Sequence, residues 1–284
     1  MEKKWTAVIK PKRKMFSLNL KEVMKYKDLI WLFVKRDIKT RYKQTVLGPL
    51  WFIIQPLMTS VIHTLVFGTL AGIAPGGVPQ YLFYLAGSIS WGLFSGCLTS
   101  TSNTFVGNAG VFGKVYFPRL TTPISTVMVQ MFNFLIQFGI FMVMSLIFFL
   151  AGEYFEITWV AALLPVLMLQ MALLGLGFGI IISSLTTKYR DLQVLVGFGV
   201  SLWMYVTPVV YAANTVSQES VMYQAMMINP VSPIIEIFKC GWLGPNAGST
   251  PWMYWGISWI FTFAVVIVGI MIFNKIEKNF MDTV

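Results

Sequence analysis

Long apolar runs separated by short polar stretches make up most of the chain after residue 49. A bilayer core of about 30 Å needs roughly 20 helical residues, and six of the runs reach this length. They are Leu50–Ile73, Tyr81–Ser102, Leu120–Ala151, Ile157–Leu185, Leu192–Ala212 and Trp252–Phe273. The pattern therefore predicts an all-α integral membrane protein with six transmembrane helices.

Two shorter apolar pieces lie between the fifth and sixth runs, around Val221–Ile228 and Val231–Leu243. Each has roughly ten residues, which is too few to cross a bilayer. Backbone at membrane depth must also satisfy its hydrogen bonds within the protein. We therefore expect two short re-entrant helices on the outer side, just before the last span.

The segment Asp28–Lys43 precedes the first run and mixes apolar with charged residues. Apolar side chains recur every four positions from Ile30 to Tyr42, and basic side chains fill the other faces. This spacing predicts an amphipathic interface helix in the inner headgroup layer. Such a helix could simply anchor the chain, or it could receive a cytoplasmic partner or an anionic lipid headgroup.

Composition and charge agree with a lipid-embedded chain. Only 11% of the residues are charged, against roughly 25% in soluble domains. Of the 21 Lys and Arg residues, all except Lys239 lie before the first run, in the loops after the second and fourth runs, or in the C-terminal tail. The positive-inside rule then places both termini in the cytoplasm. Residues 1–49 form a cytoplasmic segment, residues 50–284 form the transmembrane domain, and the net charge of +10 reports topology rather than nucleic-acid binding.

Several kinds of chemistry are disfavoured by what the runs contain. The chain has no GxxxxGK[ST] phosphate loop, no metal-ligand spacing around its two cysteines, and no Asp, Glu, Lys or Arg in the middle of a run. Ion-coupled carriers normally need ionisable groups inside their spans. Membrane transferases generally place acidic or histidine clusters at a membrane face, and the acids of the outer segments here have no histidine or Asp-rich motif beside them. We therefore expect no enzymatic activity, no cofactor and no metal in this chain. Gly175 and Gly179 are spaced for close helix packing rather than for nucleotide binding.

Four spaced motifs carry a family resemblance. They are Lys35–Trp51 (KRDIKTRYKQTVLGPLW), Lys188–Leu192 (KYRDL), Thr207–Tyr211 (TPVVY) and Asn229–Pro230. In this order they resemble the membrane subunits of polysaccharide ABC exporters, the Wzm-like permeases for O-antigen, teichoic acid and capsule polysaccharide. The similarity extends over essentially the whole chain.

The resemblance implies a permease that forms a homodimer and pairs with two copies of a cytoplasmic ATP-binding subunit. ATP and Mg would be bound by that partner, and this multi-pass chain would lie in the bacterial inner (plasma) membrane. The substrate would be a polysaccharide linked to undecaprenyl pyrophosphate, with O-antigen as the expected polymer. Export of teichoic acid, of capsule polysaccharide, or of small molecules or drugs by the same permease class stays open.

The resemblance further implies that the inner loop Thr104–Arg119 is a coupling helix that touches the ATPase. An ordinary cytoplasmic loop is the alternative. The residues expected at this contact are Lys35, Arg36, Asp37, Arg41, Asn108, Phe112, Lys114 and Tyr116. Four basic residues of the amphipathic segment could also attract the lipid pyrophosphate by charge; they are Lys35, Arg36, Lys39 and Arg41.

Polar and aromatic residues inside the runs are candidates for a substrate channel. Gln130, Asn133 and Gln137 follow one another at spacings of three and four, so they share one helix face. Such amides either hydrogen-bond to other helices or edge a hydrated conduit and meet sugar hydroxyls. The candidate aromatic residues near mid-span are Trp91, Trp203 and Tyr205. Their rings could stack on the apolar faces of sugars or simply pack within the bundle.

Overall fold

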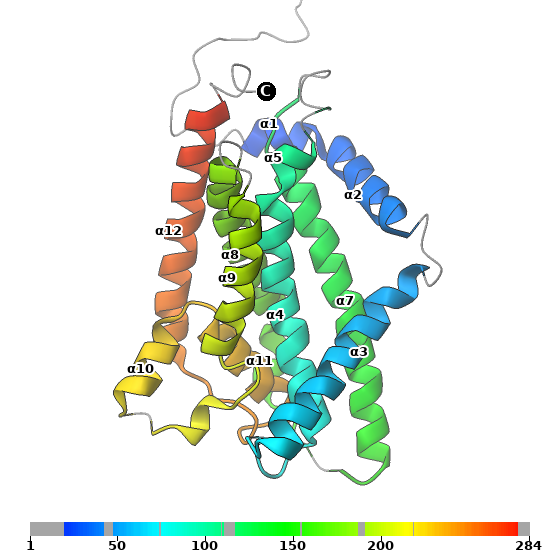
Figure 1. Ribbon diagram of the computed structural model, residues 1–284, viewed down its shortest axis with the longest axis vertical. Coiled ribbons are helices and arrows are strands. Elements are labelled where there is room, and N and C mark those ends of the chain that lie inside the picture. Colours follow the sequence, from blue (N-terminus) through cyan, green and yellow to red (C-terminus); the bar gives the residue numbers. More distant parts are fainter. Residues whose placement is uncertain are drawn as a thin grey trace, which may run out of the picture.

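The chain folds into one bundle of helices. The computed structural model describes residues 20–42, 48–73, 75–108, 110, 117–153, 155–186, 191–217 and 219–277. Within these segments the regular structure is helical and contains no strand, and the long helices run side by side (Figure 1). The predicted all-α class is confirmed for this part of the chain.

Five helices in the described segments are long and apolar enough to cross a membrane. They are α3 (Trp51–His63) with its π-helical continuation η2 (Thr64–Leu70), α4 (Gln80–Ser102), α7 (Thr121–Leu150), η3 (Trp159–Leu163) with α8 (Leu164–Thr186), and α12 (Trp252–Glu277). Each coincides with one of the apolar runs. Five of the six apolar runs therefore form helices that are long and apolar enough to cross a membrane.

The remaining run forms a shorter helix than predicted. Helix α9 covers Leu192–Val206, or 15 residues, which is about 22 Å at 1.5 Å per residue and less than a bilayer core. Proline has no N–H to continue a helix, and it disfavours helical geometry in the residue before it. Thr207, which precedes Pro208, is accordingly extended, with ψ 143°. The complete six-span arrangement stays a prediction.

The short helices gather at the two ends of the bundle. Helices α1 (Leu20–Lys25), α2 (Lys27–Tyr42) and α5 (Thr104–Gly107) lie at the end where α12 finishes (Figure 1), and the short turn η1 (Gly48–Leu50) directly precedes α3. Helices α10 (Val221–Ile228) and α11 (Ser232–Leu243) lie toward the other end, near the turn η4 (Ala213–Thr215) (Figure 1). The two expected short helices therefore exist, and their re-entrant placement stays a prediction.

Helix α2 is amphipathic and docks through its apolar face. Phe33 and Val34 are buried, whereas Lys35 and Lys39 are exposed. Phe33 packs in a cluster with Phe117 and Phe273, which joins α2 to the neighbouring ends of α7 and α12. The amphipathic helix is thus attached to the bundle through apolar contacts, and its exposed lysines remain on the outside.

Helix α4 is the centre of the bundle, and glycines let α8 approach it closely. A Cβ added at Gly175 would lie 2.5 Å from the Cβ of Cys97, and one added at Gly179 would lie 2.4 Å from the Cβ of Thr101. Real Cβ atoms do not come this close. The predicted packing role of these two glycines is confirmed.

Candidate functional site

A cavity of about 570 Å³ lies among α3, α4, α7 and α9. Five of the six predicted channel residues line it: Trp91, Gln130, Asn133, Gln137 and Tyr205. The three amides share one face of α7, as their spacing predicts, and in the structure this face is directed toward α4 and into the cavity. Whether polymer passes here is not tested by the geometry, so the channel assignment stays a prediction.

The amides on α7 form a hydrogen-bonded chain along one wall of the cavity. Gln130 Nε2 donates to Ser100 Oγ on α4 at 2.7 Å, and Asn133 Nδ2 donates to Gln130 Oε1 at 3.0 Å. A Cβ at Gly96 would lie 3.0 Å from Gln130 Oε1, so this glycine makes room for the amide. The two interpretations of the amides are therefore compatible, because the same groups join two helices and edge the cavity.

Helix α3 provides the opposite wall and adds polar groups. Gln55, Thr59 and His63 line the cavity from this side. The ring Nδ1 of His63 lies 3.3 Å from Ser88 Oγ on α4. The histidine thus has a side-chain partner on α4 and also faces the cavity, so the structural and the pore-facing interpretations of this residue are compatible.

Trp203 does not line this cavity. Its ring packs against Trp91 and Phe94, with centroid distances of 6.3 and 5.2 Å. Its Nε1 donates to Asn229 Oδ1 at 3.1 Å, and Asn229 Nδ2 donates to Thr207 Oγ1 at 2.8 Å. Trp203 therefore supports the wall from behind and ties α9 to the start of the α11 region.

A second polar groove, of about 440 Å³, lies between α2 and the junction of α4 with α5. Arg36 bridges it: its Nε donates to Asp37 Oδ1 at 2.8 Å, and its Nη2 donates to Asn108 Oδ1 at 3.2 Å. Three predicted coupling residues are thus brought together. Because Arg36 already has a carboxylate partner, its charge is less available to a pyrophosphate than the charges of the exposed Lys35 and Lys39.

The structure does not describe the side chains of four other predicted coupling residues. Phe112, Lys114 and Tyr116 lie outside the described residues, as does the side chain of Arg41. Their coupling roles stay predictions.

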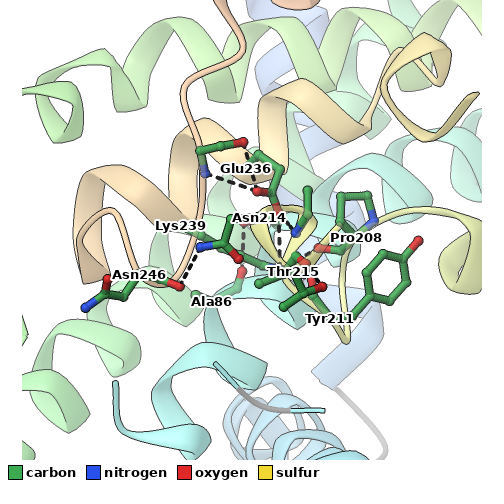
Figure 2. A network of polar contacts seen from close by, with 12 residues as sticks. Ala86, Pro208, Tyr211, Asn214, Thr215, Glu236, Lys239 and Asn246 are labelled. Carbon is green, nitrogen blue, oxygen red and sulfur yellow. Dashed lines mark hydrogen bonds and ion pairs between the residues drawn. The ribbon is translucent and has the colours of Figure 1, made fainter. Parts of the chain in front are cut away.

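The opposite end of the bundle contains a buried ion pair that the sequence interpretation did not identify. Lys239 Nζ lies 3.8 Å from Glu236 Oε1 on α11, and both side chains have no exposed surface (Figure 2). Lys239 donates to the carbonyl oxygens of Pro208 and Tyr211 and lies 4.1 Å from the centroid of the Phe83 ring. The sequence signal was available, because a Glu and a Lys stand three residues apart in an otherwise apolar segment.

Burial and pairing act in opposite directions on these two groups. Burial lowers the pKa of Lys239 to about 8, and the charge of Glu236 opposes this shift. Burial raises the pKa of Glu236, opposed by Lys239 and by hydrogen bonds from the Ala213 N–H and from Ser249. Each group therefore depends on the other to remain charged inside the protein.

Comparison with known protein families decides the identity of the chain. The model of the ABC-2 type transporter membrane family matches residues 28–241. The chain belongs to the ABC-2 type transporter family. The matched region runs from α2 to α11, so it contains the cavity, the Arg36 groove and the buried ion pair.

Individual relatives cover between 78% and 90% of the chain. It is 29% identical over 260 residues to an O-antigen export system permease protein RfbA from Klebsiella pneumoniae, which covers 90% of this chain and 94% of the relative. The identity is 25% over 221 residues to RfbA from Myxococcus xanthus, covering 78% and 82%. It is 23% over 253 residues to the polysialic acid transport protein KpsM from Escherichia coli, covering 87% and 93%. The resemblance found in the motifs is confirmed at the level of this family.

Proposed function

We propose that this chain is the membrane-spanning permease subunit of an ATP-driven exporter that moves a lipid-linked polysaccharide, with O-antigen as the expected polymer, across the bacterial inner membrane. The observation that carries the proposal is the cavity, which offers amide, hydroxyl and aromatic groups inside a bundle of apolar helices. The chain belongs to the ABC-2 type transporter family, and several of its relatives are named for polysaccharide export. A polar cavity between apolar helices could bind such a polymer during transport.

The cavity chemistry suits a sugar chain. Amides such as Gln137 both donate and accept hydrogen bonds, which matches the hydroxyl groups around a sugar ring. Aromatic faces such as that of Trp91 can cover the apolar C–H faces of the same ring. Neither kind of contact holds the substrate covalently, so a polymer could advance by exchanging one set of contacts for the next.

The energy would come from a separate ATP-binding subunit docked at the end that carries α2 and α5. Arg36 links α2 directly to Asn108 at the end of α5. A displacement of α2 by the partner would therefore reach α5 through this hydrogen bond, and α5 follows directly on α4, which forms part of the cavity wall. The basic face of α2 would lie at the cytoplasmic membrane surface, as the positive-inside rule requires.

A second copy of the chain would complete the path. Helices α3 and α9 flank the cavity and present exposed apolar side chains, including Met58 and Ile62 on α3 and Phe198 on α9. Exposed apolar side chains beside a polar cavity fit an interface between copies as well as contact with lipid. A homodimer would place two such cavities around one shared route.

Deletion of the gene in its native host tests the proposal. We expect surface polysaccharide to disappear and its lipid-linked form to accumulate on the inner face of the membrane, with both effects reversed by a plasmid copy. Affinity-tagged chain should co-purify with an ATP-binding subunit and with a second, differently tagged copy. Unchanged surface polysaccharide in the deletion strain would refute the export function.

A further inference from the structure

We propose that the polymer moved through this cavity has an electrically neutral repeating unit. The inference rests on the proposed export function and specifies its substrate class. Of the polymers that the sequence leaves open, it argues against those with charged backbones or acidic sugars. Teichoic acid, with its phosphodiester backbone, and acidic capsule polysaccharides are the substrates it excludes.

The lining of the cavity carries the argument. Among the described residues that line it, none is Asp, Glu, Lys or Arg. Its polar groups are instead the amides of Gln55, Gln130, Asn133 and Gln137, together with Ser, Thr and Tyr hydroxyls. Such a surface can satisfy hydroxyl groups fully, and it offers no counter-charge to a carboxylate or a phosphate.

His63 does not change this conclusion. It is the titratable imidazole of the lining, and its ring lies against Phe67 and Tyr84, with centroid distances of 5.8 and 6.3 Å. Its Nδ1 is already within hydrogen-bonding distance of Ser88 Oγ. A single ring enclosed in this way could not neutralise a polymer that brings a charge with every repeat.

A charged group would be costly to place in this cavity. The walls are formed by apolar helices, so a charge inside them loses much of its hydration and must find a partner in the protein. A sugar hydroxyl loses less free energy on leaving water, because a hydrogen bond to an amide can replace its hydrogen bond to water. An uncharged lining therefore favours a neutral chain over an acidic chain of the same size.

The position of the exposed lysines also supports a neutral polymer. Exposed Lys35 and Lys39 lie on α2, at the end of the bundle, and not in the cavity. Charge is thus available where a lipid pyrophosphate would wait, while the route for the sugars is neutral. A route built for an acidic polymer would be expected to continue the basic residues inward.

Charge substitutions of both signs test the inference with the native substrate. Gln137 on α7 and Ser201 on α9 would each be replaced by Lys and by Glu in the native host, and surface polysaccharide would be measured. We expect all four variants to reduce export by roughly ten-fold or more, with Lys and Glu equally harmful, because either charge lacks a partner in the cavity. The matched control is Gln224→Lys and Gln224→Glu on the exposed face of α10, which should export normally.

Two results would overturn the neutral-polymer inference. One is a sign difference, in which Lys at position 137 or 201 preserves or raises export while Glu abolishes it. The other is normal export by all four variants, which would mean that the polymer avoids this cavity. Membrane abundance and co-purification with the ATP-binding subunit show that each variant has folded.

Chemical analysis of the exported polymer gives a second, independent readout. We expect its repeating unit to contain no uronic acid, sialic acid or phosphate, and an acidic repeat would overturn the inference. The deletion strain separates the two proposals. If deletion leaves the surface polysaccharide intact, the export function fails, whereas export of an acidic polymer leaves that function standing and removes only the neutral-substrate inference.

Discussion

Lys239 and Glu236 form an ion pair inside the protein, with Lys239 Nζ 3.8 Å from Glu236 Oε1 and both side chains fully buried. The pair also joins separate segments of the chain. Lys239 donates to the carbonyl oxygens of Pro208 and Tyr211, which lie in the segment just after the end of α9. Glu236 accepts from both the N–H and the hydroxyl of Ser249. Together the two side chains hold the end of α9 and the segment before α12 against α11.

Loss of one partner should therefore harm the fold more than loss of both. We expect Lys239→Met to destabilise the protein by about 3–5 kcal/mol, because Glu236 is left buried and unpaired. The double variant Lys239→Met with Glu236→Leu should recover most of this loss, since no lone charge remains. Thermal unfolding of the detergent-purified protein measures the coupling, and equal losses in the single and double variants would contradict the ion-pair interpretation.

The glycine contacts between α4 and α8 give a separate test of packing. Gly179→Ala should destabilise the bundle by about 1–3 kcal/mol, because the new methyl group overlaps Thr101 and forces the two helices apart. Gly256→Ala in α12 is the matched control, since nothing lies within 4 Å of its added Cβ. That control should be neutral or stabilise by about 0.5–1 kcal/mol through better helix propensity. A similar loss at both positions would show that close packing is not the cause.

The role of Arg36 as a connector between α2 and α5 can be distinguished from an effect of its positive charge alone. Arg36→Lys keeps the positive charge, but a single ammonium group cannot reproduce the guanidinium contacts with both Asp37 and Asn108. If Arg36 acts as a connector, we expect this variant to lower the transport-coupled ATPase activity of the assembled complex roughly 3- to 10-fold. Lys27→Gln, at an exposed position in the first turn of α2, is the control for charge. Normal activity in Arg36→Lys together with a loss in Lys27→Gln would assign the effect to charge instead.

Much of this architecture could be predicted from local pattern. Runs of about 20 apolar residues identify spans because lipid length fixes helix length, and the three- and four-residue spacing of the α7 amides fixes the face they share. The end of α9 was harder to place, since the apolar run continues past Pro208 although the helix cannot. Lys239 was assigned to the outer side from its position alone, but its pairing depends on how α11 packs against the end of α9.

The channel residues show the same division between local and tertiary information. Trp91 and Trp203 have similar sequence surroundings, yet one lines the cavity and the other lies behind it and binds Asn229. Side-chain direction across the bundle decides the difference, and no local pattern encodes it. For His63 the sequence leaves a structural histidine and a pore-facing group both open, and its contact with Ser88 and its position in the lining agree with both.

The final prediction separates the two roles of the α7 amides. Gln130 bonds to Ser100 and to Asn133, so Gln130→Leu should cost roughly 0.6–1.7 kcal/mol of stability, the range found for hydrogen bonds between membrane helices. Gln137 lies half-buried on the cavity wall, so Gln137→Leu should leave thermal stability unchanged or slightly raised while export falls, because a hydroxyl-binding group is lost from the route. Thermal unfolding and surface polysaccharide, measured on both variants, would test this. If Gln137→Leu destabilises the protein as much as Gln130→Leu and exports normally, the whole amide row serves to join helices, and the route for the polymer must be sought elsewhere in the bundle.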